Sequence, residues 1–392
     1  MSNSETIIGQ ISERFPPEIV IFIGAGASVE FGMPLMSGFF GKYFNDYNPE
    51  HLKSLASSAN LTDDNLLALF ILDYAEKYNA IKKGEFEVDL ENLLNYIIEC
   101  QNSIKKKDNI KNSNLLNILN LAVLSRYGLG TDIKTELLDI WNDFKLKVDS
   151  LINTLLMRLY TVYNINFENV NLCNTIVGRY EMFFRHLLER ETIKGNIYIF
   201  TTNYDPCLDL FFKMGDSNYN RTFVDGIHKV SGSRFWDLSN YIPNTQSTII
   251  ALFNLHGSIL WTKSNGRIYK RKLDESNMMD SVDKISLIPP YIKKPDKPPF
   301  KEMYDFYNLI CSNEQLRYYI SIGYSFRDEE IRKNTADGLN KNKSKILHIN
   351  HGGINYDELL EMYDGSKMKR IEILQEKFDN TMILGPIRKF VS

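Results

Sequence analysis

Three strand-like segments of this sequence end in residues that could bind a nucleotide and move a proton. The segments and the residues after them are 19–23 with Gly24-Ala-Gly-Ala-Ser28, 196–200 with Thr201-Thr-Asn-Tyr-Asp205, and 248–255 with His256-Gly257. Glycines at a strand end let backbone N–H groups approach a phosphate. An imidazole titrates near neutral pH, which suits a general base. Ligands of open α/β sheets bind beyond the carboxyl ends of the strands, so these side chains are expected to meet there.

The glycine turn is of the dinucleotide-binding type, although it departs from both common phosphate-binding fingerprints. In the Gly-x-Gly-x-x-Gly pattern the third glycine would fall on Val29. A Walker loop is excluded, because Gly41-Lys42 is followed by Tyr43 where serine or threonine is needed. A helix N-terminus after the turn would favour an anion by about 0.3–1 kcal/mol. The alternative is a tight connection without a ligand, in which Ser28 only caps a helix.

The polar cluster after the second strand and the histidine after the third supply the candidate catalytic groups. Asn203 and Asp205 are expected to point into the crevice at the strand ends, and His256 is placed as a general base. Asp205 followed by Pro206 can also be a plain helix start, with the aspartate as N-cap. His351 is the reserve candidate for the base, and the other histidines are interpreted as structural.

Two later strand ends complete the predicted site. Gly323 and Ser325 follow a fourth strand-like segment, and Asn350 follows a fifth. A small residue and a hydroxyl suit a phosphate, and an amide can reach ribose hydroxyls. The sequence Arg327-Asp-Glu-Glu330 is interpreted as the first turn of a helix, where carboxylates stabilise the helix dipole.

The spacing of apolar residues and prolines predicts an α/β protein with a helical insertion. Five short segments, several of them apolar throughout, are typical of strands buried on both faces of a parallel sheet; they cover residues 19–23, 196–200, 248–255, 318–322 and 345–349. No proline lies between Pro49 and Pro206, and apolar residues recur there at helical spacing. We therefore predict a Rossmann-like, doubly wound parallel sheet from residues 1–40 and 196–392, with residues 41–195 as a helical insertion subdomain. The tail beyond Asn350 is expected to be helical.

Composition excludes several classes of protein. Lysine and arginine number 46 against 49 aspartates and glutamates, so no basic excess favours nucleic acid. The 4 cysteines are too far apart for a Cys-x-x-Cys zinc or redox pair, so we expect buried thiols and no metal site. Cys207, beside the polar cluster, is the one thiol that could be catalytic. With no membrane-spanning run and no secretory signal, a cytoplasmic protein is expected.

Taken in order along the chain, the strand-end motifs resemble the motif series of the sirtuin superfamily. The resemblance rests on Gly24-Ala-Gly-Ala-Ser28, Thr201-Thr-Asn-Tyr-Asp205, Leu255-His-Gly257, Gly323-Tyr-Ser325 and Ile349-Asn350. The chain looks most similar to the bacterial sirtuin-like NAD-cleaving proteins of antiphage defence. This resemblance implies NAD as substrate, Asn203 as the residue that orients the nicotinamide ribose and the attacking water, and His256 as the catalytic histidine.

The resemblance also assigns the remaining NAD contacts. Asp205 is implied to lie near the carboxamide. The other implied NAD-binding residues are Gly24, Ala25, Gly26 and Ser28 at the pyrophosphate, Ser325 and Asn350 at the adenosine half, and, with no part of NAD specified, Thr202 and Gly323.

Two departures from the family bear on the reaction. Protein-deacylating sirtuins share a Cys-x-x-Cys zinc module and an Asp-Phe-Arg after the glycine turn, whereas this chain has neither and carries Met33-Pro-Leu-Met36 there. We therefore expect hydrolysis, or cyclising cleavage, of the nicotinamide–ribose bond, without zinc. The alternatives are a binding module that senses NAD or ADP-ribose, and an NAD-dependent deacylase or ADP-ribosyltransferase.

Control of the activity is also expected, because an unrestrained NAD hydrolase would empty its own cell. The expected means are homo-oligomerisation or a separate partner. In related defence systems such partners include HerA-type ATPases and short Argonautes, which is an analogy between systems.

Overall fold

The computed structural model describes most of the sheet-forming part of the chain and shorter stretches of its middle segment. The described residues are 3–33, 35, 54, 62–77, 81–82, 85–86, 93–94, 96–101, 133–188, 193–214, 221–230, 233–244, 247–265, 267–271, 285–287, 298–351, 362–363, 370–378 and 383–391. The chain divides into two compact units, one of residues 1–33 with 162–392 and one of residues 34–161.

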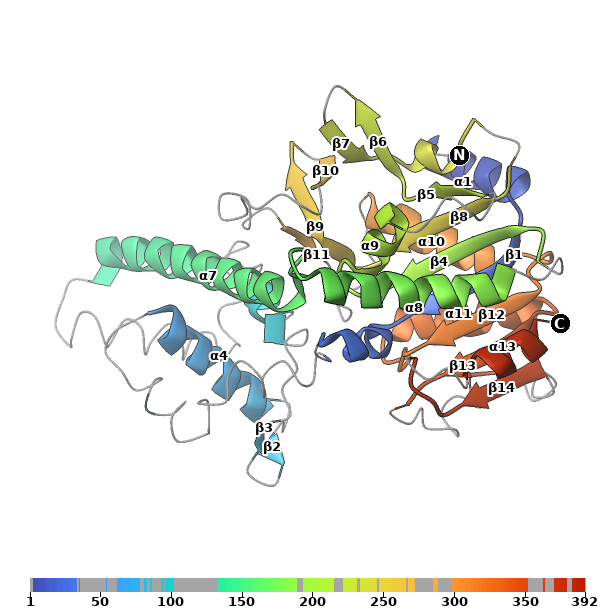
Figure 1. The fold of residues 1–392 in the computed structure, drawn as a ribbon. Helices are drawn as coiled ribbons and strands as arrows, with labels where there is room; N and C mark the ends of the chain where they lie inside the picture. Colours follow the sequence, from blue (N-terminus) through green and yellow to red (C-terminus); the bar gives the residue numbers. More distant parts are fainter. Residues whose placement is uncertain are drawn as a thin grey trace. The chain divides into compact units, whose positions relative to one another are not determined.

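A seven-stranded sheet forms the centre of the first unit, and its neighbouring strands all pair in parallel (Figure 1). In order across the sheet the strands are β14 (Ile371–Leu374), β13 (Lys345–Ile349), β12 (Tyr318–Ile322), β1 (Pro17–Ile23), β4 (Asn196–Thr201), β8 (Ile249–Asn254) and β5 (Thr222–Val224). The first strand in the chain lies in the middle, and later strands are added on both sides of it. The order reverses at β1 and β12, the kind of place where open α/β sheets bind ligands.

The strands that the apolar segments predicted are the buried ones. Every residue of β1, β4, β8 and β12 is buried, and so is every residue of β13 after its first. Strands covered on both faces need apolar side chains at consecutive positions, which is why the sequence pattern identified them. The two edge strands, β5 and β14, are mostly half-buried and were not predicted.

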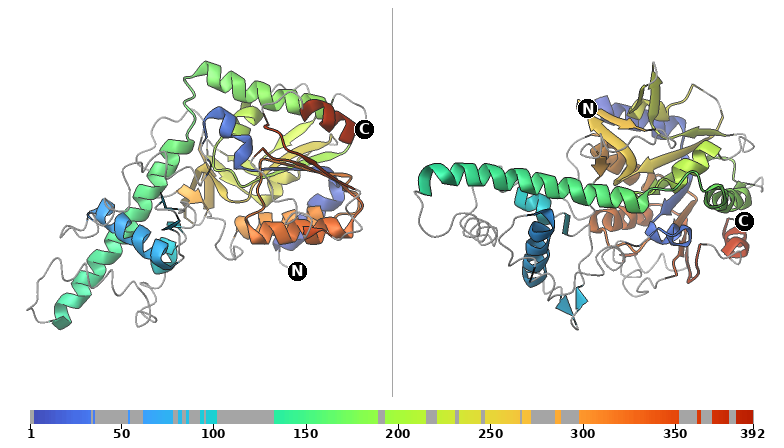
Figure 2. Two further views of the ribbon diagram at one scale, coloured as in Figure 1. Left: turned by 90° about the horizontal axis from the view of Figure 1, so that it is seen from below. Right: turned by 60° about the vertical axis from the view of Figure 1, so that its left-hand side comes forward.

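Helices cover both faces of this sheet, so the predicted doubly wound fold is confirmed (Figure 2, left). On one face lie α1 (Asn3–Arg14), α10 (Phe300–Cys311) and α11 (Glu329–Lys341), and on the other lie α8 (Val170–Leu188), α9 (Cys207–Met214) and α13 (Leu384–Phe390). Each of these helices has buried apolar residues, as in α8, where Ile176, Phe183 and Leu187 are fully buried or nearly so.

A second, antiparallel sheet was not predicted. Its strands in order are β11 (Ile285–Leu287), β9 (Gly257–Ser264), β10 (Arg267–Lys270), β7 (Ser233–Trp236) and β6 (Ile227–Val230). Lys270, at the end of β10, is buried and lies 2.5 Å from Asp209 of α9 and 2.6 Å from Asp225. Burial lowers the pKa of Lys270, but the two carboxylates outweigh it and raise the pKa above its usual value. This charged cluster links the antiparallel sheet to α9, a helix that covers the parallel sheet.

Among the described residues of the second unit are helices and a short hairpin. Its described elements are α4 (Asp63–Lys77), the hairpin of β2 (Ile81–Lys82) and β3 (Glu85–Phe86), and the greater part of α7 (Ile133–Tyr163). The predicted insertion, 41–195, differs from this unit mainly at its second boundary, because residues 162–195, including α8, belong to the unit of the parallel sheet. Phe144, Leu151, Leu155 and Leu159 of α7 are buried at helical spacing. The apolar positions at 115–121 lie outside the described residues.

The C-terminal tail corrects one prediction. Ile371, Ile373 and Leu374 were expected in a helix, but they lie in β14, which pairs in parallel with β13. Isoleucine is β-branched and favours strands, and here the open edge of β13 supplies the backbone partners that stabilise the extended form.

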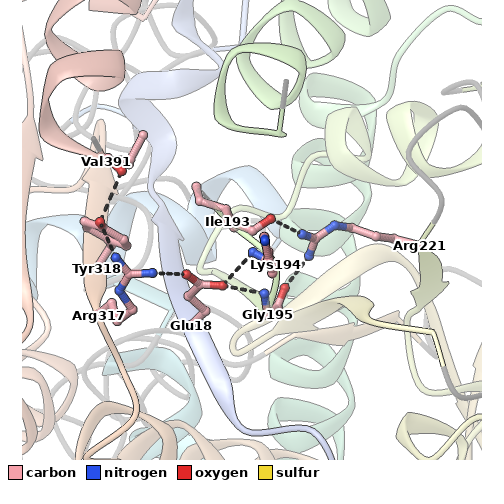
Figure 3. A network of polar contacts seen from close by, with 8 residues as sticks. All are labelled: Glu18, Ile193, Lys194, Gly195, Arg221, Arg317, Tyr318 and Val391. Carbon is pink, nitrogen blue, oxygen red and sulfur yellow. Dashed lines mark hydrogen bonds and ion pairs between the residues drawn. The ribbon is translucent and has the colours of Figure 1, made fainter. Parts of the chain in front are cut away.

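At the amino ends of the strands, Glu18 ties three neighbouring strands together (Figure 3). One of its oxygens lies 2.6 Å from the guanidinium of Arg317, which precedes β12. The other accepts the N–H of Lys194, at 2.9 Å, and that of Gly195, which precedes β4. This network lies at the opposite end of the sheet from the predicted site, so its role is structural.

Replacing Glu18 by Ala should therefore lower the free energy of unfolding by about 1.5–3 kcal/mol, since the N–H groups of Lys194 and Gly195 lose a buried, charged acceptor. Urea unfolding of the purified protein measures the change. Glu13→Ala, an exposed residue of α1, is the matched control and should stay within about 0.5 kcal/mol of wild type. Equal stability of the two variants would show that the Glu18 network does not hold the strand ends.

Candidate functional site

The glycine turn and the end of β12 touch through their backbones at the point where the strand order reverses. Gly26 N–H donates to the carbonyl of Gly323 at 2.9 Å. A Cβ on Gly24 would lie 2.6 Å from that same oxygen. Gly323 has φ +63°, and a Cβ there would lie 2.3 Å from the Ala27 nitrogen. The glycines of both motifs are thus required by this mutual contact, whatever ligand is bound.

The turn offers fewer phosphate-binding groups than the sequence suggested. The N–H groups of Gly24, Gly26, Ala27 and Ser28 all donate to backbone carbonyls, which leaves that of the half-buried Ala25. Residues 25–27 and 29–31 form 3₁₀ turns, and no α-helix begins within residues 24–33. The favourable helix dipole expected just after the turn is therefore absent from this stretch.

Asn203 is held against the glycine turn by its side chain. Its Nδ2 donates to the carbonyl of Gly24 and to the hydroxyl of Ser28, each at 3.1 Å. Its N–H donates to Thr201 Oγ1 at 3.0 Å. Its amide oxygen, Oδ1, is buried and has no hydrogen-bond partner among the described residues. The turn fixes the direction of the amide and leaves one strong acceptor unused.

Asp205 has the helix-capping role that the sequence allowed. Its Oδ1 accepts the Cys207 N–H at 3.1 Å, so it does cap the start of α9. Burial raises the pKa of its carboxyl group. Burial, and then the nearby Asp205, also raises the pKa of the Cys207 thiol well above its usual value, which keeps that thiol protonated. All four cysteines are buried thiols outside disulfides, as predicted, and Cys207 has no features of a nucleophile.

His256 is almost completely buried and is held through one ring nitrogen. Its Nε2 lies 3.1 Å from Asp328 Oδ2 and 3.0 Å from the hydroxyl of Tyr304. Its other nitrogen, Nδ1, is buried without a hydrogen-bond partner among the described residues. The rings of Tyr204 and Tyr304 flank the imidazole, each with its centroid 6.4 Å away.

Asp328 and Tyr304 are site residues that the sequence analysis missed. Asp328 was interpreted as part of the first turn of a helix, and it is indeed the N-cap of α11: its Oδ1 accepts the Ile331 N–H at 3.0 Å. Its second oxygen, which faces His256, could not be inferred from sequence, because the two residues are 72 positions apart.

The structure places Asn203 and His256 on adjoining loops at the carboxyl ends of two neighbouring strands. Thr201 and Asn254 are register partners in the parallel strands β4 and β8, and each candidate lies two residues beyond one of them. The loops are joined by Leu255 N–H to the carbonyl of Thr201, at 2.8 Å. A second bond joins Ile259 N–H to the carbonyl of Tyr204, at 3.0 Å.

The remaining predicted residues lie around this centre with fewer fixed contacts. Thr202 is half-buried beside Asn203, and Ser325 is exposed. Asn350 is half-buried, and its N–H donates to the carbonyl of Leu374 at 3.0 Å. Ser325 and Asn350 follow β12 and β13, on the other side of β1 from Asn203 and His256. The reserve candidate, His351, is exposed.

The described part of the chain lacks a metal-binding cluster and a membrane-spanning helix. No group of three or more His, Cys, Asp or Glu side chains there is arranged to hold a metal ion. None of the helices described is both long enough and apolar enough to cross a bilayer.

His348, interpreted as structural, is buried in β13. Its Nδ1 lies 2.6 Å from the Ser321 hydroxyl and its Nε2 lies 3.2 Å from that of Tyr363. Burial lowers the pKa of His348 from 6.5 to about 3. In the unfolded chain the imidazole takes up a proton near pH 6.5, whereas in the folded protein it stays neutral down to about pH 3.

The stability that neutral His348 supports should therefore be complete above pH 6.5 and be lost as the pH falls toward 3, with about 2 kcal/mol lost by pH 5. In His348→Gln the fall in unfolding free energy between pH 7 and pH 5 should be smaller by that amount. The exposed His228, changed to Gln, is the control and should keep the wild-type slope. If wild type, His348→Gln and His228→Gln all lost the same unfolding free energy between pH 7 and pH 5, the buried neutral His348 would not be the cause of the pH dependence.

Comparison with known proteins gives distant structural likeness only. No protein-family model matches the chain, and no curated protein matches it in sequence. Among solved structures, Sir2Tm bound to a propionylated peptide is 10% identical, with a TM-score of 0.33, and 99% of this chain and 98% of that chain are covered. A second solved structure, described as "The Structural basis of Sirtuin Substrate Affinity", is 10% identical with a TM-score of 0.35, and 99% of each chain is covered. Cytosolic 5'-nucleotidase IIIB bound to cytidine is 11% identical with a TM-score of 0.28, covering 100% of this chain and 91% of that chain. At these scores the fold class rests on the strand order and helix layers of this chain itself.

Proposed function

We propose that this protein cleaves the nicotinamide–ribose bond of NAD, releasing nicotinamide and ADP-ribose. One observation carries the proposal. The Asn203 amide oxygen and the His256 Nδ1 are both buried and unpartnered among the described residues, on adjoining loops at the carboxyl ends of β4 and β8.

Two such atoms on adjoining loops need an explanation. A buried polar atom without a hydrogen bond costs about 1–3 kcal/mol of stability, and most buried polar groups in proteins are satisfied. Both atoms can accept a hydrogen bond, and Nδ1 can also accept a proton. The Asn203 amide is held by the hydrogen bonds of its Nδ2, and the His256 ring is held by the contact of its Nε2 with Asp328. That arrangement suits a water molecule, or a ribose hydroxyl, bound between them during a reaction.

The reaction matches what these two groups can supply. The bond between the ribose carbon and the pyridinium nitrogen breaks, and its electron pair neutralises the positive ring as nicotinamide leaves. A water molecule forms the new carbon–oxygen bond and loses a proton, which His256 Nδ1 accepts. Asn203 Oδ1 accepts a hydrogen bond from the same water and orients it toward the oxocarbenium-like carbon.

The other motifs would hold the rest of the dinucleotide. The strand order reverses beside the glycine turn, so NAD would lie across it, with the pyrophosphate near the Ala25 N–H. Ser325 and Asn350 are on the side that suits the adenosine half, and Asp205 and Thr202 are on the side of the nicotinamide. The resemblance of these strand-end motifs to sirtuins supports this orientation.

Access to the reacting atoms requires movement. Asn203 and His256 are 6% and 1% exposed, so bulk water does not reach their unpartnered atoms in this conformation. We expect binding of NAD to accompany an opening of the site, after which closure excludes competing water.

Incubation of the purified protein with NAD, followed by chromatography of the products, tests the proposal. Nicotinamide and ADP-ribose, linear or cyclic, should appear in equal amounts. Nicotinamide release only when an acyl-peptide or a protein acceptor is added would identify a deacylase or transferase. Tight binding of NAD without any cleavage would identify a sensing module, and neither binding nor cleavage would refute an NAD site altogether.

The proposed role is NAD depletion in antiphage defence, in which the free monomer is restrained until it self-assembles or binds a partner such as a HerA-type ATPase or a short Argonaute. The restraint predicts that specific activity rises when protein concentration drives assembly, or when the neighbouring gene product is added. Size-exclusion chromatography with an activity assay across the eluted peaks measures this. A monomer that is fully active at cellular NAD concentrations would contradict it.

A further inference from the structure

We propose that Asp328 is the positioning residue of His256: it keeps a proton on Nε2 and so leaves Nδ1 as the atom that accepts a proton from the substrate water. The final step of this proposal depends on the proposed NAD cleavage. The pairing itself is a property of the fold and can be measured without any substrate.

The two oxygens of Asp328 have separate partners. Oδ1 accepts the N–H of Ile331, which caps α11, and Oδ2 lies 3.1 Å from His256 Nε2. Asp328 is 4% exposed, so water does not compete for either oxygen. The cap therefore fixes the carboxylate on the rigid end of a helix and aims its free oxygen at the imidazole.

This geometry selects one tautomer of the histidine. An ionised carboxylate can only accept hydrogen bonds, so the ring nitrogen that faces it must carry the proton. In the neutral imidazole the proton is then on Nε2, and Nδ1 keeps its lone pair. The opposite tautomer would set the Nε2 lone pair against a carboxylate oxygen in a buried site, which is electrostatically unfavourable.

Neighbouring rings hold the imidazole in this orientation. Tyr304 lies nearly parallel to it, at an interplanar angle of 9°, and its hydroxyl is 3.0 Å from Nε2. Tyr204 lies near the imidazole at an interplanar angle of 37°. Nε2 thus contacts Tyr304 of α10 and Asp328 at the start of α11, whereas Nδ1 lies on a different side of the ring.

Two substitutions separate orientation from helix capping. In Asp328→Asn the oxygen must stay on the Ile331 N–H, because only an oxygen can accept it, so the NH2 group faces Nε2. An NH2 group donates, so Nε2 must then accept and the proton moves to Nδ1. In Asp328→Ser the hydroxyl still caps α11, since serine is a good N-cap, but it is too short to reach the imidazole.

The experiment combines nitrogen NMR of the histidine rings with NAD cleavage by the whole chain. Long-range ¹H–¹⁵N spectra distinguish the two tautomers, and a His256→Phe sample identifies the His256 signals. We expect the wild-type proton on Nε2, the Asp328→Asn proton on Nδ1, and a mixture in Asp328→Ser. The kcat of Asp328→Asn should fall by about 10²–10⁴-fold, more than that of Asp328→Ser, with similar unfolding free energies for both.

A wild-type proton on Nδ1, or no change of tautomer in Asp328→Asn, would overturn the proposal. So would equal losses of kcat in the two variants, because a purely structural role predicts no difference between them. The expected tautomers in a protein that does not cleave NAD would refute the proposed function and leave the pairing in place.

Discussion

Replacing Asn203 by Ala should lower the rate of nicotinamide release by about 10²–10³-fold while the fold persists. The variant removes the oxygen that orients the water, together with two hydrogen bonds from Nδ2 to the glycine turn. The ribose carbon would still be bound, but the attacking water would lose its direction. The measurement is the steady-state rate of nicotinamide release with NAD at saturation.

Asn196 is a matched control for Asn203, because it is the first residue of β4 and Asn203 lies two residues beyond the last residue of that strand. Asn196 is also 6% exposed, but its amide is satisfied: Nδ2 donates to the carbonyl of Pro16 and Oδ1 accepts the Ile249 N–H, each at 2.9 Å. Asn196→Ala should cost about 1–3 kcal/mol of stability, as Asn203→Ala does. Only Asn203→Ala should lose activity beyond its loss of folded protein. Equal activity losses in the two variants would show that Asn203 has only a structural role.

The second large effect is expected at Gly323, where substitution by Ala should lower the free energy of unfolding by about 2–5 kcal/mol. The residue has φ +63°, which is strained for any side chain, and its Cβ would meet the Ala27 nitrogen at 2.3 Å. Backbone cannot yield as a flexible side chain can, so the glycine turn must be pushed away from β12. NAD binding should weaken as well, because the turn lies under the proposed pyrophosphate position.

At a glycine within a helix, the same substitution by Ala should raise the unfolding free energy. Gly178 lies within α8, and a Cβ there would have no atom within 4 Å. Gly178→Ala should therefore raise the unfolding free energy by about 0.5–1 kcal/mol. Urea unfolding of both variants measures the pair. A Gly323→Ala protein as stable as wild type would contradict the close backbone contact between the two motifs.

The sequence was most informative where one local cause determines the structure. β1, β4, β8, β12 and β13 were predicted because strands covered on both faces must be apolar throughout. The short edge strands and the antiparallel sheet were not predicted. In the antiparallel sheet, β7 and β10 have four residues each and mix charged with aromatic side chains. Their strand form depends on partners elsewhere in the chain, which a local pattern does not contain.

The same distinction applies to the candidate site. The glycines were correctly expected to let backbone groups approach closely, but part of what approaches them is Gly323, roughly 300 residues away along the chain. Asp328 was correctly assigned to a helix start, yet its contact with His256 joins residues brought together only by folding. Sequence spacing identifies which side chains stand at strand ends, and the tertiary fold decides which of their atoms are left without partners.

A structure of this protein with ADP-ribose bound would test the joint role of Asn203 and His256 most directly. The ribose carbon once joined to nicotinamide should lie between Asn203 Oδ1 and His256 Nδ1, with a water or hydroxyl hydrogen-bonded to both atoms. The pyrophosphate should lie beside the glycine turn. ADP-ribose bound elsewhere, or bound with those two atoms facing separate spaces, would show that the two residues do not form one site.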